Sequence, residues 1–203
     1  MQLSENNSFK GGFQSPVFDA QQGFNLAMQA MSRPGTVQQV PAIVAPPAPL
    51  NDATGLLALT LFDADTAVFI APALKTEDVV TWLRFHTGAP IIDNKAEAQF
   101  ALLDDISALQ CFELFALGTQ EYPDRSTTLI AQVDGFDDQS QWQLSGPGIN
   151  GTTSLSPKGC GDISSTWAHN NALFPRGVDL FLAAPRALAA LPRTTKLTMA
   201  GEL

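Results

Sequence analysis

The feature that most constrains the fold is a short run at residues 66–71, Thr-Ala-Val-Phe-Ile-Ala, which lies between two stretches with helical patterning. An uninterrupted apolar run of this length is typical of a β-strand covered on both faces. A helix that is apolar on most sides, and therefore buried, is expected before it at 51–62. A second helix is expected after it at 77–87. The alternation predicts an α/β fold in which a mixed β-sheet is covered by helices.

The second of these helices has clear signals at both ends. Thr76 is placed to cap its N-terminus, acidic residues follow in the first turn, and Gly88 comes directly after the last turn. Another helix is expected from Asp19 to about Met31, with Phe24, Met28 and Met31 on one face.

The remaining pattern is weaker and gives further elements. Helices are expected at 107–117 and 163–172, and strands at 99–103, 178–183, 188–191 and 196–199. The strands at 127–133 and 141–144 are predicted to pair antiparallel around an acidic turn at 134–139.

A chain of 203 residues is long enough for one well-filled core, so a single domain over 1–203 is expected. The proline-rich segment 41–49 is interpreted as a loop inside that domain. Residues 1–12 are polar and are expected to be disordered.

Composition excludes several classes of function. The net charge of −9 argues against binding to nucleic acid or to anionic lipid, because both need basic surfaces. No apolar run is long enough for a membrane helix, and the first residues lack the apolar core of a signal peptide. With Cys111 and Cys160 as its two cysteines, the chain is expected to be cytoplasmic, with reduced thiols. A hydrophobic fraction of 45% with 15% charged residues indicates either a large core or apolar surface that a partner covers.

The sequence predicts no catalytic residue, no metal site and no cofactor. It has no phosphate-binding Gly-x-x-x-x-Gly-Lys-Ser/Thr loop. Residues 146–148, Gly-Pro-Gly, resemble a dinucleotide loop only superficially, because the third glycine is missing and proline removes an amide. The cysteines and histidines lack metal-ligand spacing.

Arg33, Arg84, Arg176 and Arg193 stand on turns or at element ends in a chain with few cations. Guanidinium groups in such places suit phosphate or phosphonate, and they equally suit salt bridges and helix C-termini. His86, in the last turn of the helix at 77–87, suits a helix C-terminus, with a general base as the alternative, and it joins the arginines as an anion candidate. These five residues are the candidate anion-binding residues.

Six stretches, taken in order, closely resemble the PhnH family, subunits of the bacterial carbon–phosphorus lyase core complex. They are 29–35 (Gln-Ala-Met-Ser-Arg-Pro-Gly), 83–90 (Leu-Arg-Phe-His-Thr-Gly-Ala-Pro), 118–119 with 122–124 (Gly-Thr and Tyr-Pro-Asp, before the strand at 127–133), 144–149 (Leu-Ser-Gly-Pro-Gly-Ile), 174–179 (Phe-Pro-Arg-Gly-Val-Asp) and 191–195 (Leu-Pro-Arg-Thr-Thr). The resemblance extends from about Asp19 to about Leu197. Segments 41–49, 134–139 and 154–162 depart from it.

The resemblance implies a role in using phosphonates as a phosphorus source, in assembly with PhnG, PhnI and PhnJ. With PhnG, PhnI and PhnL, such subunits are associated with displacing adenine from ATP by a phosphonate, which gives a ribose 1-phosphonate 5-triphosphate. PhnJ later cleaves the carbon–phosphorus bond. The resemblance further implies a homodimer when isolated, and a fold similar to the large domain of pyridoxal-phosphate-dependent transferases without the cofactor.

Three roles remain open from the sequence. The first is a structural and interaction subunit, which the lack of catalytic motifs favours. The second is an enzyme that binds a phosphorylated substrate through the turn arginines. The third is a degenerate transferase that keeps a regulatory small-molecule site.

Overall fold

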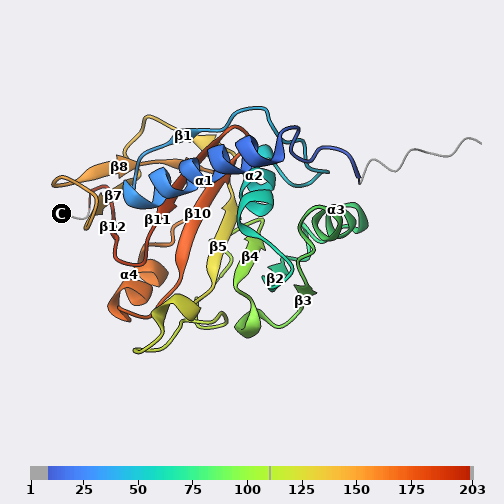
Figure 1. Cartoon of the computed structure of the whole chain (residues 1–203). Coiled ribbons are helices and arrows are strands. Elements are labelled where there is room, and N and C mark those ends of the chain that lie inside the picture. Colours follow the sequence, from blue (N-terminus) through green and yellow to red (C-terminus); the bar gives the residue numbers. More distant parts are fainter. Residues whose placement is uncertain (1–8, 110, 202–203) are drawn as a thin grey trace, which may run out of the picture.

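The computed structural model describes residues 9–109 and 111–201 and has a seven-stranded mixed sheet at its centre (Figure 1). The strand order is β1-β11-β10-β5-β4-β2-β3. The five strands β3, β2, β4, β5 and β10 run parallel, and β11 runs antiparallel between β10 and β1. The strands are β1 (Gln38–Gln39), β2 (Val68–Ile70), β3 (Ile91–Ile92), β4 (Phe100–Leu103), β5 (Thr128–Gln132), β10 (Asp179–Ala184) and β11 (Ala187–Leu191).

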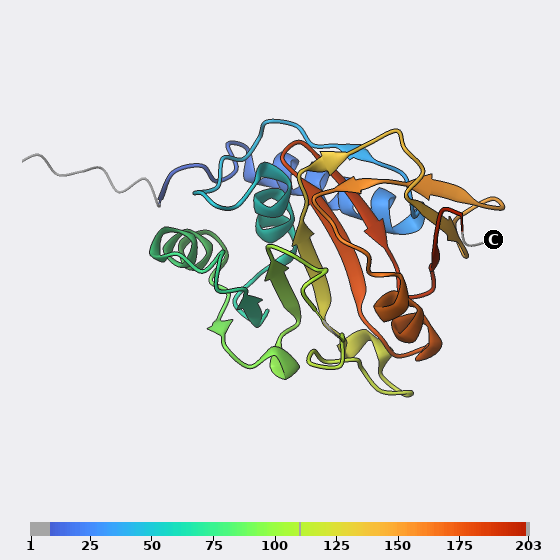
Figure 2. The ribbon, with the colours of Figure 1, turned by 180° about the vertical axis from the view of Figure 1, so that it is seen from behind.

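Three helices pack on one face of this sheet: α1 (Pro16–Ser32), α2 (Asp52–Leu61) and α3 (Glu77–Thr87) (Figure 1). The other face is covered by α4 (Ser164–Ala172) and by two small sheets, as the reverse view shows (Figure 2). The small sheets are β12-β7-β8 and β6-β9, made of β6 (Gly135–Phe136), β7 (Trp142–Ser145), β8 (Thr153–Leu155), β9 (Pro157–Lys158) and β12 (Lys196–Met199). Two 3₁₀ turns, η2 (Lys95–Glu97) and η3 (Pro123–Arg125), precede β4 and β5.

The two-sided core follows from the apolar strands. In β5, Leu129 and Ala131 join the core under α4 and the small sheets, while Ile130 joins the core under α1, α2 and α3. Successive side chains of a strand point to opposite faces, so a strand in the middle of the sheet must be apolar at every position. The predicted α/β class and the mixed sheet covered by helices are confirmed.

The best-signalled helices lie where the sequence predicts them. In α3 the Thr76 hydroxyl accepts from the Val79 amide, and Gly88 ends the helix in the left-handed conformation at φ 73°. The helix expected to be buried, α2, is buried over residues 53–58, including Leu56 and Leu57, while Leu59 and Leu61 near its end are partly buried.

The helix predicted at 107–117 is wrong. The described residues there form separate turns, such as those closed by the Leu109 amide on Ile106 and the Phe115 amide on Phe112. Phe112 and Phe115 are buried while Leu114 between them is exposed, and this spacing imitates a helical face.

The predicted antiparallel pair of 127–133 with 141–144 is also wrong. β5 runs parallel between β4 and β10, and β7 pairs with β8 and β12 in a different sheet. β5 is buried on both faces and belongs at the centre of the main sheet. β7 alternates buried Trp142 and Leu144 with partly exposed residues, which suits a covering strand.

At the N-terminus, α1 begins at Pro16, three residues before the predicted start, and Asp19 accepts from the Ser15 amide. Disorder is expected for residues 1–12, and of these, residues 1–8 lie outside the described part of the chain. Residues 9–12 make specific contacts with α3 and with Ala45. Among the described residues, no helix has both the length and the apolar character needed to cross a membrane.

Candidate functional site: the groove beside α1

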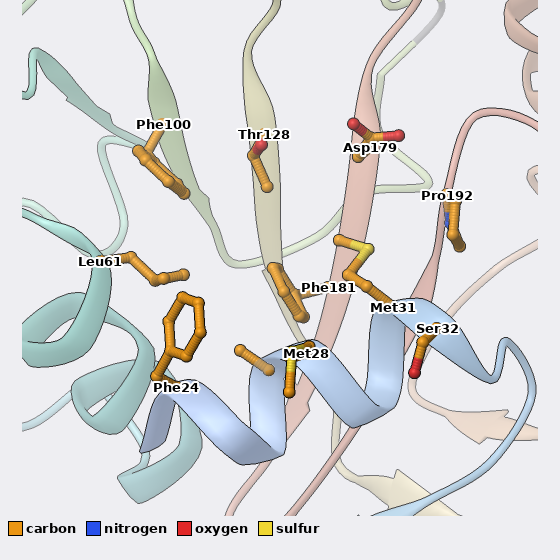
Figure 3. Close-up of a pocket in the computed structure, with 11 residues that line it drawn as sticks. Phe24, Met28, Met31, Ser32, Leu61, Phe100, Thr128, Asp179, Phe181 and Pro192 are labelled. Atoms are coloured by element: carbon orange, nitrogen blue, oxygen red, sulfur yellow. The ribbon is translucent and has the colours of Figure 1, made fainter. Parts of the chain in front are cut away.

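A cavity of about 630 Å³ lies between α1 and the beginnings of three parallel strands (Figure 3). Its floor is a row of neighbouring first residues, Phe100 of β4, Thr128 of β5 and Asp179 of β10, which the sheet register places side by side. Phe24 and Met31 rise from α1 toward this row. Most of the lining is apolar, and its polar members are Ser32, Thr128 and Asp179. The apolar lining residues are Phe24, Ala27, Met28, Met31, Leu61, Phe100, Phe181 and Pro192.

Two further hollows share lining residues with this one. It shares Phe24 and Met28 with a cavity of about 450 Å³ on the outer side of α1. It shares Asp179 and Pro192 with one of about 350 Å³ that reaches Phe174. We call these three neighbouring hollows the α1 groove.

The groove exposes large apolar side chains and little charge. Phe18, Phe24 and Met28 of α1 are 73%, 56% and 49% exposed, and Phe174 at the far end is 61% exposed. Val17, next to the groove on α1, is 78% exposed. Between residues 11 and 32 the only charged residue is Asp19. A helix face rich in Phe and Met and free of charge has the composition of the centre of a protein interface.

Arg193 lies at this groove, but its guanidinium has no free donor. Nε and Nη2 donate to the two carboxylate oxygens of Asp179, and Nη2 also donates to the Ser126 hydroxyl at 2.6 Å. Nη1 donates to the carbonyl oxygens of Pro123 at 2.8 Å and Pro175 at 3.3 Å. Because a guanidinium has five N–H groups, these five bonds use all of them. The side chain joins the starts of β5 and β10 to two turns.

The other arginines are differently placed. Arg33 follows the last turn of α1, is exposed, and holds its turn through its backbone: its amide donates to Gln29, and its carbonyl accepts from Thr36. Arg176 is partly buried, and its Nε is buried without a hydrogen-bond partner among the described residues.

Arg84 and His86 lie in the last turn of α3, which is on the β3 side of the sheet (Figure 1). Arg84 is exposed. His86 is partly buried beside the rings of Trp82 and Phe85, with centroid distances of 5.1 and 4.9 Å. The five candidate residues therefore do not converge on one anion site.

The edge where α/β sheets commonly bind ligands, at the carboxyl ends of the parallel strands, is acidic in this protein. A cavity of about 280 Å³ there is lined by Asp104 and Asp134, together with Asn51 and Gln132. The Asn51 side chain caps α2 and donates to the Ala183 carbonyl, and the side-chain Oε1 of Gln132 accepts from the Asn51 backbone amide. Two carboxylates and engaged amides make this edge unfavourable for a phosphate.

The two cysteines differ in exposure, and the buried one is poorly placed to react. Cys160 is buried, and burial followed by the nearby Asp105 and Asp162 raises the pKa of its thiol to about 12. Cys111 is partly exposed. In the described parts of the chain, no three histidine, cysteine, aspartate or glutamate side chains gather as metal ligands would.

Sequence reasoning found Phe24, Met28 and Met31 as a helix face but missed that this face borders an open groove. It also missed Leu61, Phe100 and Pro192, which come from distant elements. The available signal was the near absence of charge from 11 to 32, since a surface helix packed on one side normally carries charge on the other.

Comparison with known proteins gives consistent relationships. Residues 11–198 match the family described as "Bacterial phosphonate metabolism protein (PhnH)". Over 195 residues the chain is 45% identical to the "Alpha-D-ribose 1-methylphosphonate 5-triphosphate synthase subunit PhnH" of Rhizobium meliloti (strain 1021), covering 96% of this chain and 98% of the relative. Over 185 residues it is 30% identical to a provisionally named C-P lyase subunit protein, HtxG, of Stutzerimonas stutzeri, covering 89% and 87%.

Proposed function

The chain belongs to the PhnH family of bacterial phosphonate metabolism proteins, and from this we propose that it is a structural and interaction subunit that meets another subunit through the α1 groove. Its place is in phosphonate catabolism, within a multisubunit carbon–phosphorus lyase complex.

The observation that carries the interaction role is the exposed apolar surface that α1 presents in the groove. Phe24 and Met28 are about half exposed, and they border a cavity floored by Phe100 and Phe181. Covering such surface removes apolar area from water, which contributes about 25 cal/mol for each Å². Two further observations favour an interaction role over substrate binding. Arg193 has no donor left for a ligand, and the sheet edge at the carboxyl ends of the parallel strands is acidic.

The finer assignments rest on the family. We propose PhnG, PhnI and PhnJ as physical partners and PhnL as a functional one, with a homodimer for the isolated chain. The assembled reaction is the displacement of adenine from ATP by a phosphonate, in keeping with the synthase name of the Rhizobium relative. We further propose that residues 1–203 act as one cytoplasmic domain, built like the large domain of pyridoxal-phosphate-dependent transferases but working without that cofactor.

One observation favours a second candidate function, direct contact with a phosphorylated substrate. Arg176 keeps a buried Nε without an acceptor among the described residues, and a phosphate or phosphonate oxygen would supply one once the side chain turns outward. Arg33, Arg84 and His86 remain candidates for the same role at separate places.

The test is assembly of the complex with a groove variant, Phe24→Ser combined with Met28→Ser. Both side chains are about half exposed, so the fold should persist while docking is lost. The control is Leu114→Ser, which removes an apolar side chain of 51% exposure whose neighbours pack on the opposite face of the sheet. Co-expression with the partner subunits, followed by size-exclusion chromatography and by phosphonate-dependent release of adenine from ATP, gives both readouts.

The double variant should lose its place in the complex, and the control should keep it. Normal assembly of the double variant would overturn the docking role of the groove. Arg176→Ala tests the second candidate function. Direct substrate contact would be shown by a complex that assembles fully but releases adenine at about a hundredth of the normal rate. That change corresponds to roughly 2.7 kcal/mol of activation free energy.

A further inference from the structure

Residues 9–13, Phe-Lys-Gly-Gly-Phe, lie across the end of α3, and we call them the N-terminal strap. The indole Nε1 of Trp82 donates to the Lys10 carbonyl at 2.9 Å. The ring of Phe9 packs on that of Phe85 at 4.8 Å. On the strap's other side, the amide of Ala45 donates to the Gly11 carbonyl at 2.9 Å. The strap is thus held between α3 and the proline-rich segment 41–49.

Two glycines make this fit possible. Gly11 has a φ of 82°, and a Cβ there would lie 1.9 Å from the Ala45 carbonyl oxygen. A Cβ on Gly12 would lie 2.4 Å from Cε1 of His86. The backbone of the strap therefore rests directly on the imidazole ring, and no side chain comes between them.

The closed strap suits a neutral His86. Nε2 of the ring is buried with no hydrogen-bond partner among the described residues, while the Lys10 backbone on the strap favours the charged ring. A protonated imidazole carries an N–H on both nitrogens, so closure would leave one charged donor buried and unsatisfied. Burial lowers the pKa of His86 below its ordinary value, and the bond to Lys10 opposes this only in part.

The charged groups around this site do not favour the imidazolium. The strap contributes Lys10, and α3 contributes Asp78, which lines a cavity together with Lys10, and the exposed Arg84. The segment 41–49 carries no charge. A carboxylate beside the ring would stabilise the proton, whereas the shifts of His86 come from burial and from the Lys10 carbonyl.

We propose that the strap is a pH-dependent latch: protonation of His86 releases residues 9–13 from α3 and uncovers the aromatic cluster of Trp82, Phe85 and His86. This inference rests on contacts within the chain and is independent of the proposed function. Because protonation favours the open form, closure is complete above the ordinary histidine pKa of about 6.5. It weakens as the pH falls from there through the lowered pKa of the closed form.

The test is amide hydrogen exchange measured by mass spectrometry on the whole chain between pH 7.5 and 5.0, corrected for the intrinsic exchange rates. The informative peptides cover the strap and the 41–49 segment, where the Ala45 amide reports on the bond to Gly11. In the wild type, protection of these peptides should fall by about threefold or more across this range. Peptides from the core strand β5 should keep theirs.

Two variants and one control distinguish release of the strap from a general loss of stability at low pH. His86→Gln, which does not titrate, should keep its protection at pH 5.0, and Gly11→Ala should be unprotected at both ends of the range. The matched control is His169→Gln, because the His169 side chain is 58% exposed and pairs with Glu113 on the surface; it should behave as the wild type does. Unchanged wild-type protection, or an equal fall in His86→Gln, would overturn the proposal.

Discussion

Removal of the Arg193 side chain tests whether this arginine holds the structure or serves a ligand. Its guanidinium donates twice to Asp179, once to the Ser126 hydroxyl and once each to the Pro123 and Pro175 carbonyls. The side chains of Arg193 and Asp179 are only 13% and 23% exposed. Arg193→Ala therefore leaves a carboxylate and three other acceptors in a largely buried place without their donor.

The expected cost is large because the pair is shielded from water. Removing one partner of a buried ion pair costs about 3–5 kcal/mol, most of it from the charge that stays behind. The backbone amide of Arg193 still donates to Asp179 at 2.8 Å, which reduces the loss. We expect the free energy of unfolding to fall by about 3 kcal/mol. Arg193→Lys should recover only part of this, because an ammonium lacks the planar fork that binds both carboxylate oxygens.

Urea unfolding followed by tryptophan fluorescence measures this change, and Arg33→Ala is the control. Arg33 is exposed and its turn depends on backbone bonds, so its loss should change stability by less than about 0.5 kcal/mol. The reasoning fails if Arg193→Ala is as stable as the control variant. It fails equally if the assembled complex with Arg193→Ala loses adenine release while the subunit keeps its stability, since that would make the arginine a ligand group.

Three further outcomes follow from burial. Leu56→Ala should lower the free energy of unfolding, measured in urea, by about 2–5 kcal/mol. Leu59→Ala, at a partly buried position, should lower it clearly less. At pH 8 the folded chain should react with iodoacetamide at Cys111 and not at Cys160, whose thiol is buried with a pKa of about 12; peptide mass spectrometry that finds Cys160 modified would contradict this. Asn170→Asp should cost about 1–3 kcal/mol in the same unfolding assay, because the buried amide donates to the Val178 carbonyl and a carboxylate would repel it.

Local signals explain which parts of the fold could be predicted from the sequence. α3 carries its cap, its first-turn acids and its terminal glycine within its own residues, and the structure places each of them as predicted. The buried strand at 66–71 is recognisable because a strand covered on both faces leaves no polar position. These are properties of neighbouring residues, which a single sequence contains.

Strand pairing depends on information that neighbouring residues do not carry. The partners of β5 are β4 and β10, and β10 begins about fifty residues later in the sequence. The nearer strand at 141–144 was the predicted partner because antiparallel neighbours are usually close in sequence. The helix prediction for 107–117 is wrong for a related reason. Phe112 packs against Trp167 and Phe115 against Phe69, so tertiary packing, not helical propensity, decides the conformation of this segment.

The turn arginines show why a candidate site is harder to predict than a helix. Arg193 and Arg176 both follow a proline on a turn, and the sequence gives them equal standing as anion ligands. They differ in the acceptors within reach: the guanidinium of Arg193 makes five hydrogen bonds, whereas the buried Nε of Arg176 finds no acceptor in the described part of the chain. Those acceptors come from Pro123, Ser126, Pro175 and Asp179, which only the folded sheet brings together. A cationic side chain can serve a ligand only with donors that the fold has left unused, so Arg176 is where a direct contact with a phosphonate should be sought first.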